Sequence, residues 1–310
     1  MSLRKIITVL LALLLAGMVV VPMVSAGDNL VSTDKKPQSS PEPVGIDVTD
    51  EELREMIVTI IKDIQSCNLD EKIKDQNVIL LSTFVDDDST INRGELEKTL
   101  ISMGPDCLEK IYKSPAPKWA GFIHNDMALI AGQKMSLSTS ERNILANNAA
   151  VPDSWGSWNH YKLTGATSEA EKYANIARAY YQQGDTTKGA YNLSYSLHFM
   201  TDMSMPFHYT PSGLLAHEDY EIYVSDHWTS GDDDEKYRDV VSGNNYYYIV
   251  TDVSDAADNL IDVTHWYQTY LEDQINNNPN WQDDSLLRDY THDTILYGAK
   301  YNMGLIDYVK

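Results

Sequence analysis

Apolar positions recur at helical intervals along most of the chain. In "TDEELREMIVTIIKDIQSC", residues 49–67, apolar side chains follow Leu53 at intervals of 3, 4, 7, 8 and 11 residues. This spacing is typical of one face of an α-helix. Thr49 and Glu52 stand at the spacing of a capping box, so the helix is predicted to begin there.

The same periodicity continues in the second half of the chain. "SEAEKYANIARAYYQQGD", residues 168–185, is predicted to form a helix that ends at Gly184, and "TTKGAYNLSYSLHFMTD" a helix that stops before Pro206. "HDTILYGAKYNMGLIDYV" predicts a helix at the C-terminus, whereas strand signals are few and short. We therefore expect a mainly α fold. The apolar positions of the two central helices are Tyr173, Ile176, Ala177, Tyr180 and Tyr181, then Leu193, Leu197 and Met200.

The first 26 residues have the pattern of an export signal. Arg4 and Lys5 precede an apolar run over residues 6–21, and Val-Ser-Ala at 24–26 is typical of a cleavage site. The pattern predicts a secreted protein. The alternative is a chain anchored to the membrane by an uncleaved signal, because the apolar run is longer than a typical signal core.

Breaks in the pattern divide the remaining chain. Residues 27–45 are polar, contain three prolines and show no periodicity, which predicts a flexible linker. Residues 46–118 are predicted to be a small helical region that ends in "SPAPK", residues 114–118, where two prolines mark a boundary. Residues 119–310 would then form one large helical domain.

One acidic stretch imitates a calcium-binding loop. Asp86–Glu97, "DDDSTINRGELE", has acids at positions 1, 3 and 12 of an EF-hand loop, but Ile91 stands where the turn needs glycine. We interpret it as a solvated loop in which Asn92 caps the next helix.

Composition narrows the choice of function. The chain has 310 residues, a 43% hydrophobic fraction that can support a packed core, and a net charge of −22. A net charge this negative repels duplex nucleic acid, whereas a bound metal can still attract a small or single-stranded phosphoester. Cys67 and Cys107 are the two cysteines; outside the cell they are able to form a disulfide, but they do not make a zinc ribbon.

The most informative stretch is "SLHFMTDMSMPFHYTPSGLLAHEDYEIY", residues 196–223. His198 and Asp202 are four residues apart on a predicted helix, and so are His217 and Glu221 on the next one. Side chains at this spacing lie on the same face. His208 follows the intervening proline, so one helical hairpin offers five nitrogen and oxygen donors of the kind zinc prefers.

A structural role is the alternative for each of these residues taken alone. One histidine on a helix is more often a core residue than a ligand. Two such pairs in one hairpin reverse that balance, because burying so many ionisable groups without a cation is costly. "HEDYE" lacks the second histidine of the H-E-x-x-H metalloprotease helix, since Glu221 replaces it, so that motif is not met.

This signature resembles a known family. His-x3-Asp-x5-His, with "MPFH" at its end, followed by His-x3-Glu, is similar to the zinc-dependent bacterial phospholipases C and the related fungal single-strand nucleases. "AAVPDSWGSWNHY" supplies the upstream Asp153 and His160, and "WAGFIHNDMALIA" places Trp119 five residues before His124. The C-terminal "YGAKYNMGLIDYV" resembles the closing helix of the family. The resemblance covers residues 119–310.

The resemblance implies a zinc-dependent phospholipase C type of helical domain with up to three zinc ions. It also implies that Asp153 acts as an acid/base helper. His227, His265 and His292 match no position of the family and are predicted to be structural. The implied ligands are Asp153, His160, His198 and Asp202 for one ion, His208, His217 and Glu221 for a second, and Trp119, His124 and the bridging Asp202 for a third.

We therefore expect a zinc-dependent phosphodiesterase that acts transiently at a membrane surface on phospholipid head groups. Glu221 favours phospholipase C, whereas the Trp119-to-His124 spacing favours the single-strand nuclease alternative. Trp155 and Trp158 are candidate substrate contacts, for a choline or for a base. Phe122 stands where choline-specific members carry an acid. A non-catalytic zinc-binding surface protein is the alternative from another class.

The family's third metal site uses the free amino group of the tryptophan. A peptide-bonded Trp119 has no such amine, so residues 27–118 are a possible pro-segment that is cut between Lys118 and Trp119. The alternative is that the helical region is a permanent accessory domain.

Overall fold

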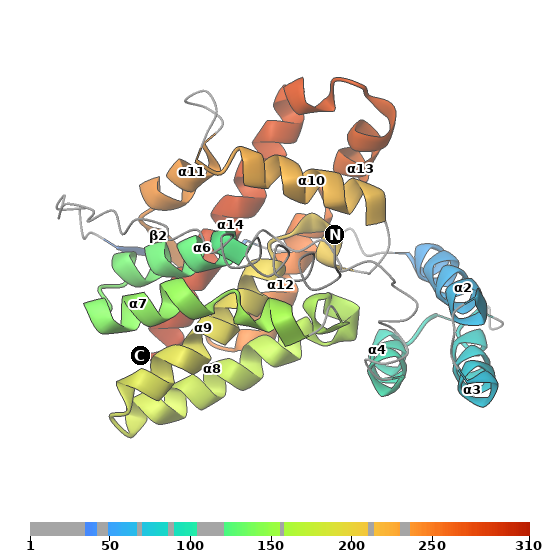
Figure 1. Ribbon diagram of the computed structural model, residues 1–310, viewed down its shortest axis with the longest axis horizontal. Helices are drawn as coiled ribbons and strands as arrows, with labels where there is room; N and C mark the ends of the chain where they lie inside the picture. Colours follow the sequence, from blue (N-terminus) through green and yellow to red (C-terminus); the bar gives the residue numbers. More distant parts are fainter. Residues whose placement is uncertain are drawn as a thin grey trace, which may run out of the picture. The chain divides into compact units, whose positions relative to one another are not determined.

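A computed structural model describes residues 35–41, 49–66, 70–85, 90–103, 121–155, 158–209, 214–229 and 236–310 (Figure 1). The described residues belong to one compact unit and are mainly α-helical, as the periodicity predicts. Their α-helices are α2 (Asp50–Ser66), α3 (Glu71–Ser82), α4 (Arg93–Ser102), α6 (Gly121–Lys134), α7 (Thr139–Asn148), α8 (Ala166–Gln182), α9 (Thr186–Asp202), α10 (Leu214–Asp226), α11 (Tyr237–Gly243), α12 (Val253–His265), α13 (Gln268–Asn277) and α14 (Ser285–Val309).

Short 3-10 helices connect several of these elements. The loop between α7 and α8 contains three of them, and the turn after α9 contains a fourth. Their bounds are η1 (Val151–Trp155), η2 (Trp158–His160), η3 (Lys162–Thr164), η4 (Pro206–His208) and η5 (Trp281–Asp283). The signal sequence, both cysteines and Trp119 lie outside the described residues.

Helices α8 and α9 form a closely packed antiparallel pair (Figure 1). The chain reverses between them at Gly184, whose φ of 79° is in the left-handed region that favours glycine. On α9 the predicted apolar positions Leu193, Leu197 and Met200 are fully buried. The sequence therefore located both helices and the core face of α9.

The core face of α8 differs from the prediction. Ile176 is 36% exposed, and the buried stripe consists of small side chains. Small residues let the backbones of two helices approach closely, which leaves the larger side chains at the edge of the contact. A Cβ added at Gly189 of α9 would lie 2.9 Å from the Tyr181 ring, which shows how tight this packing is. The buried stripe is Ala166, Ala170, Ala174 and Ala177.

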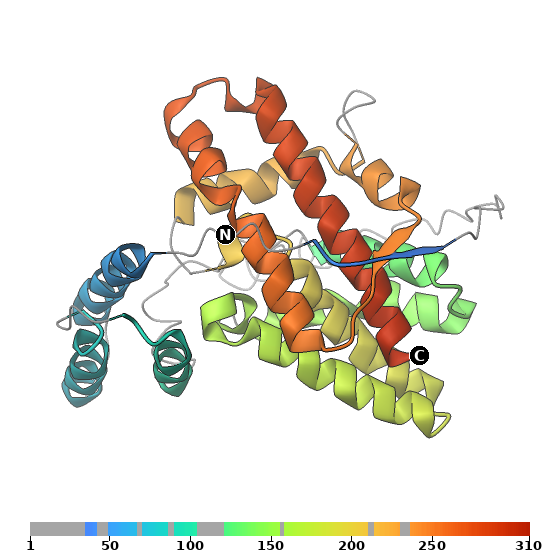
Figure 2. The same ribbon diagram turned by 180° about the vertical axis from the view of Figure 1, so that it is seen from behind.

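Helix α14 packs against several helices of the second half of the chain (Figure 2). It packs against α6, α8, α9, α11 and α12, and its inward face is buried over most of its length. Asp284 caps its first turn by accepting the Leu287 N–H at 2.8 Å, so the helix begins before the predicted start at residue 292. In the described residues no helix combines the length and the apolar character that crossing a bilayer requires.

The N-terminal helices follow their sequence pattern. On α2 the predicted positions Leu53, Ile57 and Ile64 are fully buried. Asn92 accepts the Glu95 N–H at 3.2 Å and caps α4, which confirms the cap predicted from the sequence. The calcium-loop imitation itself lies partly outside the described residues, at 86–89.

A two-stranded parallel sheet joins the segment before α2 to the segment before α12 (Figure 2). Strand β1 (Lys36–Gln38) pairs with β2 (Tyr246–Tyr248), with Lys36 opposite Tyr246 and Gln38 opposite Tyr248. Strand β1 falls within residues 27–45, where the sequence predicts a linker without regular structure. A strand this short is stabilised by pairing with β2. Because β2 is distant in sequence, the local pattern around β1 does not predict the strand.

Candidate metal centre

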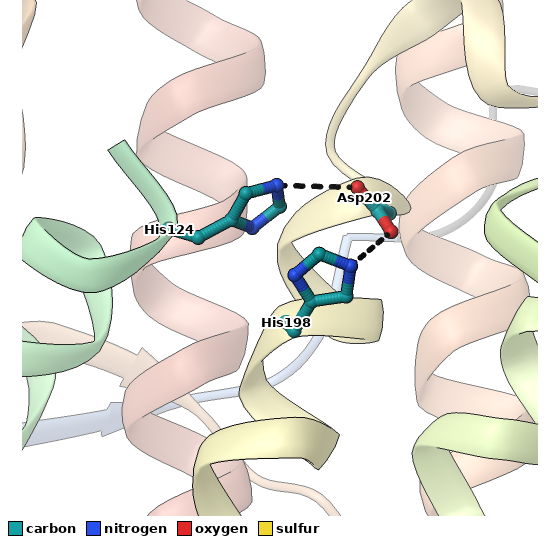
Figure 3. Close-up of side chains that lie close together, drawn as sticks. All are labelled: His124, His198 and Asp202. Atoms are coloured by element: carbon teal, nitrogen blue, oxygen red, sulfur yellow. Dashed lines mark ion pairs between the residues drawn. The ribbon is translucent and has the colours of Figure 1, made fainter. Parts of the chain in front are cut away.

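The end of α9 carries the first two candidate ligands. His198 and Asp202 lie one turn apart, and Nε2 of His198 is 3.1 Å from Oδ2 of Asp202 (Figure 3). Both side chains are buried. The helix ends at Asp202 and a turn precedes Pro206, so the next candidate ligand, His208, returns to the same region.

Asp202 is approached by four histidines. Oδ2 lies 2.7 Å from Nδ1 of His160 and also faces His198. Oδ1 lies 3.5 Å from Nε2 of His124, which comes from the first turn of α6 (Figure 3). The same oxygen lies 3.6 Å from Nδ1 of His208 on η4. One carboxylate therefore stands at the centre of groups from four separate elements.

A second group of candidate ligands extends from His208 toward α10. His217 and Glu221 lie one turn apart on that helix, with Nε2 of His217 3.1 Å from Oε1 of Glu221. Nε2 of His208 is 3.1 Å from Nε2 of His217 and 3.6 Å from Oε1 of Glu221. His208 therefore faces Asp202 with one ring nitrogen and this second group with the other.

Asp153 completes the arrangement from η1. Its Oδ1 lies 3.9 Å from Nε2 of His198. The segment is held against α6, because Asn125 accepts the Ala150 N–H at 3.0 Å. A Cβ added at Gly121 would lie 3.1 Å from the Ala150 Cβ, so the first turn of α6 and the start of η1 are in close contact. This contact with α6 therefore positions Asp153, which is distant in sequence from α9.

We call the eight candidate ligands together the ligand cluster: His124, Asp153, His160, His198, Asp202, His208, His217 and Glu221. All but one of its side chains are almost fully buried, and the exception is Asp153, which is 19% exposed. Three groups of three members each have ligand atoms that all lie within 4.8 Å of one another. The three groups are His124, His198 and Asp202; Asp153, His160 and His198; and His208, His217 and Glu221.

The charges of the ligand cluster match those of metal ligands. Burial and the neighbouring His198 hold the pKa of His124 well below its usual value, and burial also lowers the pKa of His208. Burial alone would raise the pKa of Asp202, but His198 and His160 outweigh it and hold this pKa well below its usual value. Neutral imidazoles beside ionised carboxylates are the forms that bind a metal.

The spacing of the ligand cluster also fits zinc. Tetrahedral zinc with bonds of about 2.1 Å holds its ligand atoms about 3.4 Å apart. The distances from His198 Nε2 to His160 Nδ1 and to Asp153 Oδ1 are 3.1 and 3.9 Å, which bracket that value. In the described part of the chain, Nε2 of His160 and Oε2 of Glu221 are buried without a hydrogen-bond partner. Such atoms are costly unless something outside the chain satisfies them.

Aromatic side chains surround the ligand cluster, and sequence reasoning missed them. The Tyr161 ring lies 5.2 Å from the His208 ring and 6.2 Å from the His217 ring. The Phe207 ring stacks on His217 at 5.8 Å. Phe199 lies edge-on to His198 at 5.1 Å. A signal was present, because each of these aromatic residues is next in sequence to a histidine of the cluster.

A second aromatic group is centred on Trp155, which shares η1 with the exposed Asp153. Trp155, two residues after Asp153, is 42% exposed. Its ring lies 4.9 Å from Tyr195 in an edge-on geometry and 5.6 Å from Tyr173 in a tilted one. Tyr173 stacks in turn on Phe199. Trp155 therefore remains a predicted substrate contact, and the two tyrosines that its ring meets are additional candidates.

The remaining candidates divide into two kinds. Trp119 and the side chain of Trp158 lie outside the described residues. The three histidines predicted to be structural contact aromatic rings outside the cluster: His227 contacts Tyr223, His265 contacts Tyr209, and His292 contacts Tyr237. Phe122 is 49% exposed at the start of α6.

Chemically, each of three groups in the ligand cluster is able to hold a divalent cation, and two of these groups share His198. Clustered cations of this kind stabilise negative charge on a reacting oxygen or phosphate. Comparisons of the chain with protein-family models, with curated proteins and with solved structures gave no match.

Proposed function

We propose that the protein is an exported zinc-dependent phosphodiesterase that hydrolyses phospholipid head groups as a phospholipase C. The observation that carries the proposal is the central position of Asp202. Four histidines from α6, η2, α9 and η4 approach this one buried carboxylate. A carboxylate shared between neighbouring cations suits a site that must clamp several phosphate oxygens at once.

Zinc would be held by the three groups of the ligand cluster. When bound, zinc supplies a Lewis acid and lowers the pKa of a bound water towards neutrality. The chain's own contribution is positioning. Helix α9 fixes His198 and Asp202 on one face, and the Asn125 hydrogen bond fixes the segment that carries Asp153.

Substrate would approach from the side of Asp153. It is the most exposed carboxylate of the ligand cluster, and Trp155, two residues later on η1, has an exposed ring. An aromatic face attracts a quaternary ammonium such as choline by about 0.5–2 kcal/mol. The rings around the cluster exclude water from its interior, which strengthens every charge interaction there.

A single-strand nuclease is the second candidate. The group of Trp155, Tyr173 and Tyr195 supports it, because a base stacks on an aromatic side chain with about 1–3 kcal/mol. The acidic charge of the chain argues against a duplex substrate in either case. A protein that only binds zinc would have the ligand cluster without hydrolysis.

One panel of substrates separates these candidates. The purified protein is loaded with zinc and incubated with phosphatidylcholine vesicles, a chromogenic choline phosphodiester and single-stranded DNA, each with and without chelator. We expect hydrolysis of the vesicles, loss of that activity with chelator and its return with added zinc. Cleavage of DNA alone would establish the nuclease. Full zinc loading without hydrolysis of any substrate would contradict the phosphodiesterase.

A further inference from the structure

The N-terminal region contacts residues 121–310 through a strand of its own. Strand β1 pairs with β2 through hydrogen bonds at both of its ends. The Lys36 N–H donates to the Asn245 carbonyl at 3.1 Å, and the Ile249 N–H donates to the Gln38 carbonyl at 3.1 Å. Nζ of Lys36 also lies 5.6 Å from the centre of the Tyr246 ring. This is the geometry of strand addition, in which main-chain hydrogen bonds supply the attachment.

Strand β2 is fixed independently of β1. A Cβ added at Gly304 of α14 would meet the Tyr248 carbonyl oxygen, so the strand lies directly against that helix. The Tyr248 ring packs on Tyr301 at 4.9 Å. The Asn244 side chain accepts the Tyr246 N–H at 3.0 Å and holds the start of the strand. The edge that β1 pairs with is therefore packed directly on α14.

Helix α4 makes a second attachment. It packs against η3, the short helix that follows His160. Leu96 and Leu100 of α4 are buried, and both belong to the same apolar cluster as Leu163 of η3. The N-terminal region is thus in contact with the helical domain at a point before α2 and again at α4.

We infer that residues 35–103 are held on residues 121–310 by these contacts themselves, so that a cut within residues 104–120 leaves a two-chain protein. The β1 attachment is weak alone, because each of its hydrogen bonds contributes only about 0.5–1.5 kcal/mol. Burial of the α4 leucines adds about 1.5–3 kcal/mol for each side chain. The two attachments act together, since the chain between them links β1 to α4. The inference does not depend on the proposed function.

The experiment is a cut of the intact protein at a designed position. The recognition sequence of a site-specific protease is inserted within residues 104–120, the protein is cut completely, and the product is examined by gel filtration at low micromolar concentration. We expect both pieces to elute together at the position of the uncut protein, although they separate on a denaturing gel. Separate elution of the N-terminal piece would overturn the inference.

A matched pair of variants tests the role of β1. Lys36→Pro removes the N–H that donates to Asn245, whereas Lys35→Pro makes the same change one residue before the strand begins. In the cut protein, Lys36→Pro should speed dissociation of the pieces about tenfold, which corresponds to the loss of one hydrogen bond. Equal dissociation of the two variants would show that β1 is not an attachment.

Hydrogen exchange gives a readout that needs no variant. The Ile249 amide donates to Gln38 and should stay protected after the cut if β1 stays in place. Rapid exchange of this amide in the cut protein would mean that β1 leaves, which would overturn the inference even if the pieces elute together.

Discussion

Two buried charged sites in this protein differ in how their polar atoms are satisfied. Glu141, on α7, is 5% exposed. Its Oε2 accepts the Ser138 N–H at 2.9 Å, and its Oε1 accepts Nζ of Lys310 at 2.7 Å. Nζ of Lys310 also lies 4.3 Å from the Tyr181 ring centre. Every charge at this site has a partner within the chain.

The ligand cluster is the opposite case. Two pairs of its histidine nitrogens lie 3.1 Å apart, from His198 to His160 and from His208 to His217. Nε2 of His160 and Oε2 of Glu221 are buried without a hydrogen-bond partner among the described residues. The comparison teaches that a self-sufficient buried site stabilises a fold, whereas an incomplete one indicates something bound from outside.

The largest expected difference in activity comes from replacing a carboxylate with an amide at each of the two sites. Asp202→Asn should lower phosphodiesterase activity more than about 100-fold, because second-shell partners already cost 10–100-fold and Asp202 would touch two metals. Glu141→Gln should leave the activity nearly unchanged. Zinc content, measured by mass spectrometry, should fall for the first variant only.

The control for Asp202 is His292→Gln, which changes a half-buried histidine outside the ligand cluster and should keep both zinc and activity. Equal losses in Asp202→Asn and His292→Gln, with circular dichroism unchanged, would show that the ligand assignment is wrong.

Chelation should distinguish the sites by stability. A ligand at 100 times its dissociation constant stabilises the folded state by about 2.7 kcal/mol. For a domain of this size that corresponds to a melting temperature about 5–10 °C lower after zinc removal. Thermal unfolding with and without excess chelator measures this shift. Unchanged melting in protein shown to be free of metal would contradict a structural role of the cluster's ions.

The Glu141 site should respond to acid instead. Burial alone would raise the pKa of Glu141, but Lys310 and Ser138 lower it to about 2. A carboxyl group whose pKa is lowered by folding stabilises the protein above its unfolded pKa, and this stabilisation is lost as the pH falls towards 2. In wild type we expect a loss of about 2 kcal/mol between pH 5 and pH 2 that Glu141→Gln lacks. Urea unfolding at several pH values tests it.

The smallest expected effect concerns the hydrogen bond that holds the Asp153 segment. Asn125→Ala removes the acceptor of the Ala150 N–H and should weaken zinc binding to the Asp153, His160 and His198 group severalfold, from the loss of about 1 kcal/mol. Zinc competition with a coloured chelator measures this affinity. Asn147→Ala, which removes an exposed hydrogen bond on α7, is the matched control and should bind zinc like wild type.

Local periodicity was sufficient for much of this arrangement. His198 with Asp202, and His217 with Glu221, could be paired from sequence because one helical turn brings side chains four residues apart together. The approach of Asp153 and His160 to that pair depends on the packing of η1 and η2, which local pattern does not encode. Only the family resemblance indicated it.

Two features of the fold show the same limit. The buried alanine face of α8 arises from its close contact with α9, whereas the pattern of large apolar residues predicted a face that includes the exposed Ile176. Strand β1 contains Pro37 and Lys36, which are poor strand formers, and is ordered by β2. In both cases the partner decides the outcome, and the partner is distant in sequence.

Exposure differs across the ligand cluster, and this difference would set how fast each bound ion exchanges with solution. Among its described side chains, Asp153 is 19% exposed and the others are 4% or less. An ion beside Asp153 would exchange with solution first, while ions deeper in the cluster would leave only when helices open locally. A purified sample would then record the metals present while the chain folded, rather than those in the buffer in which it is stored.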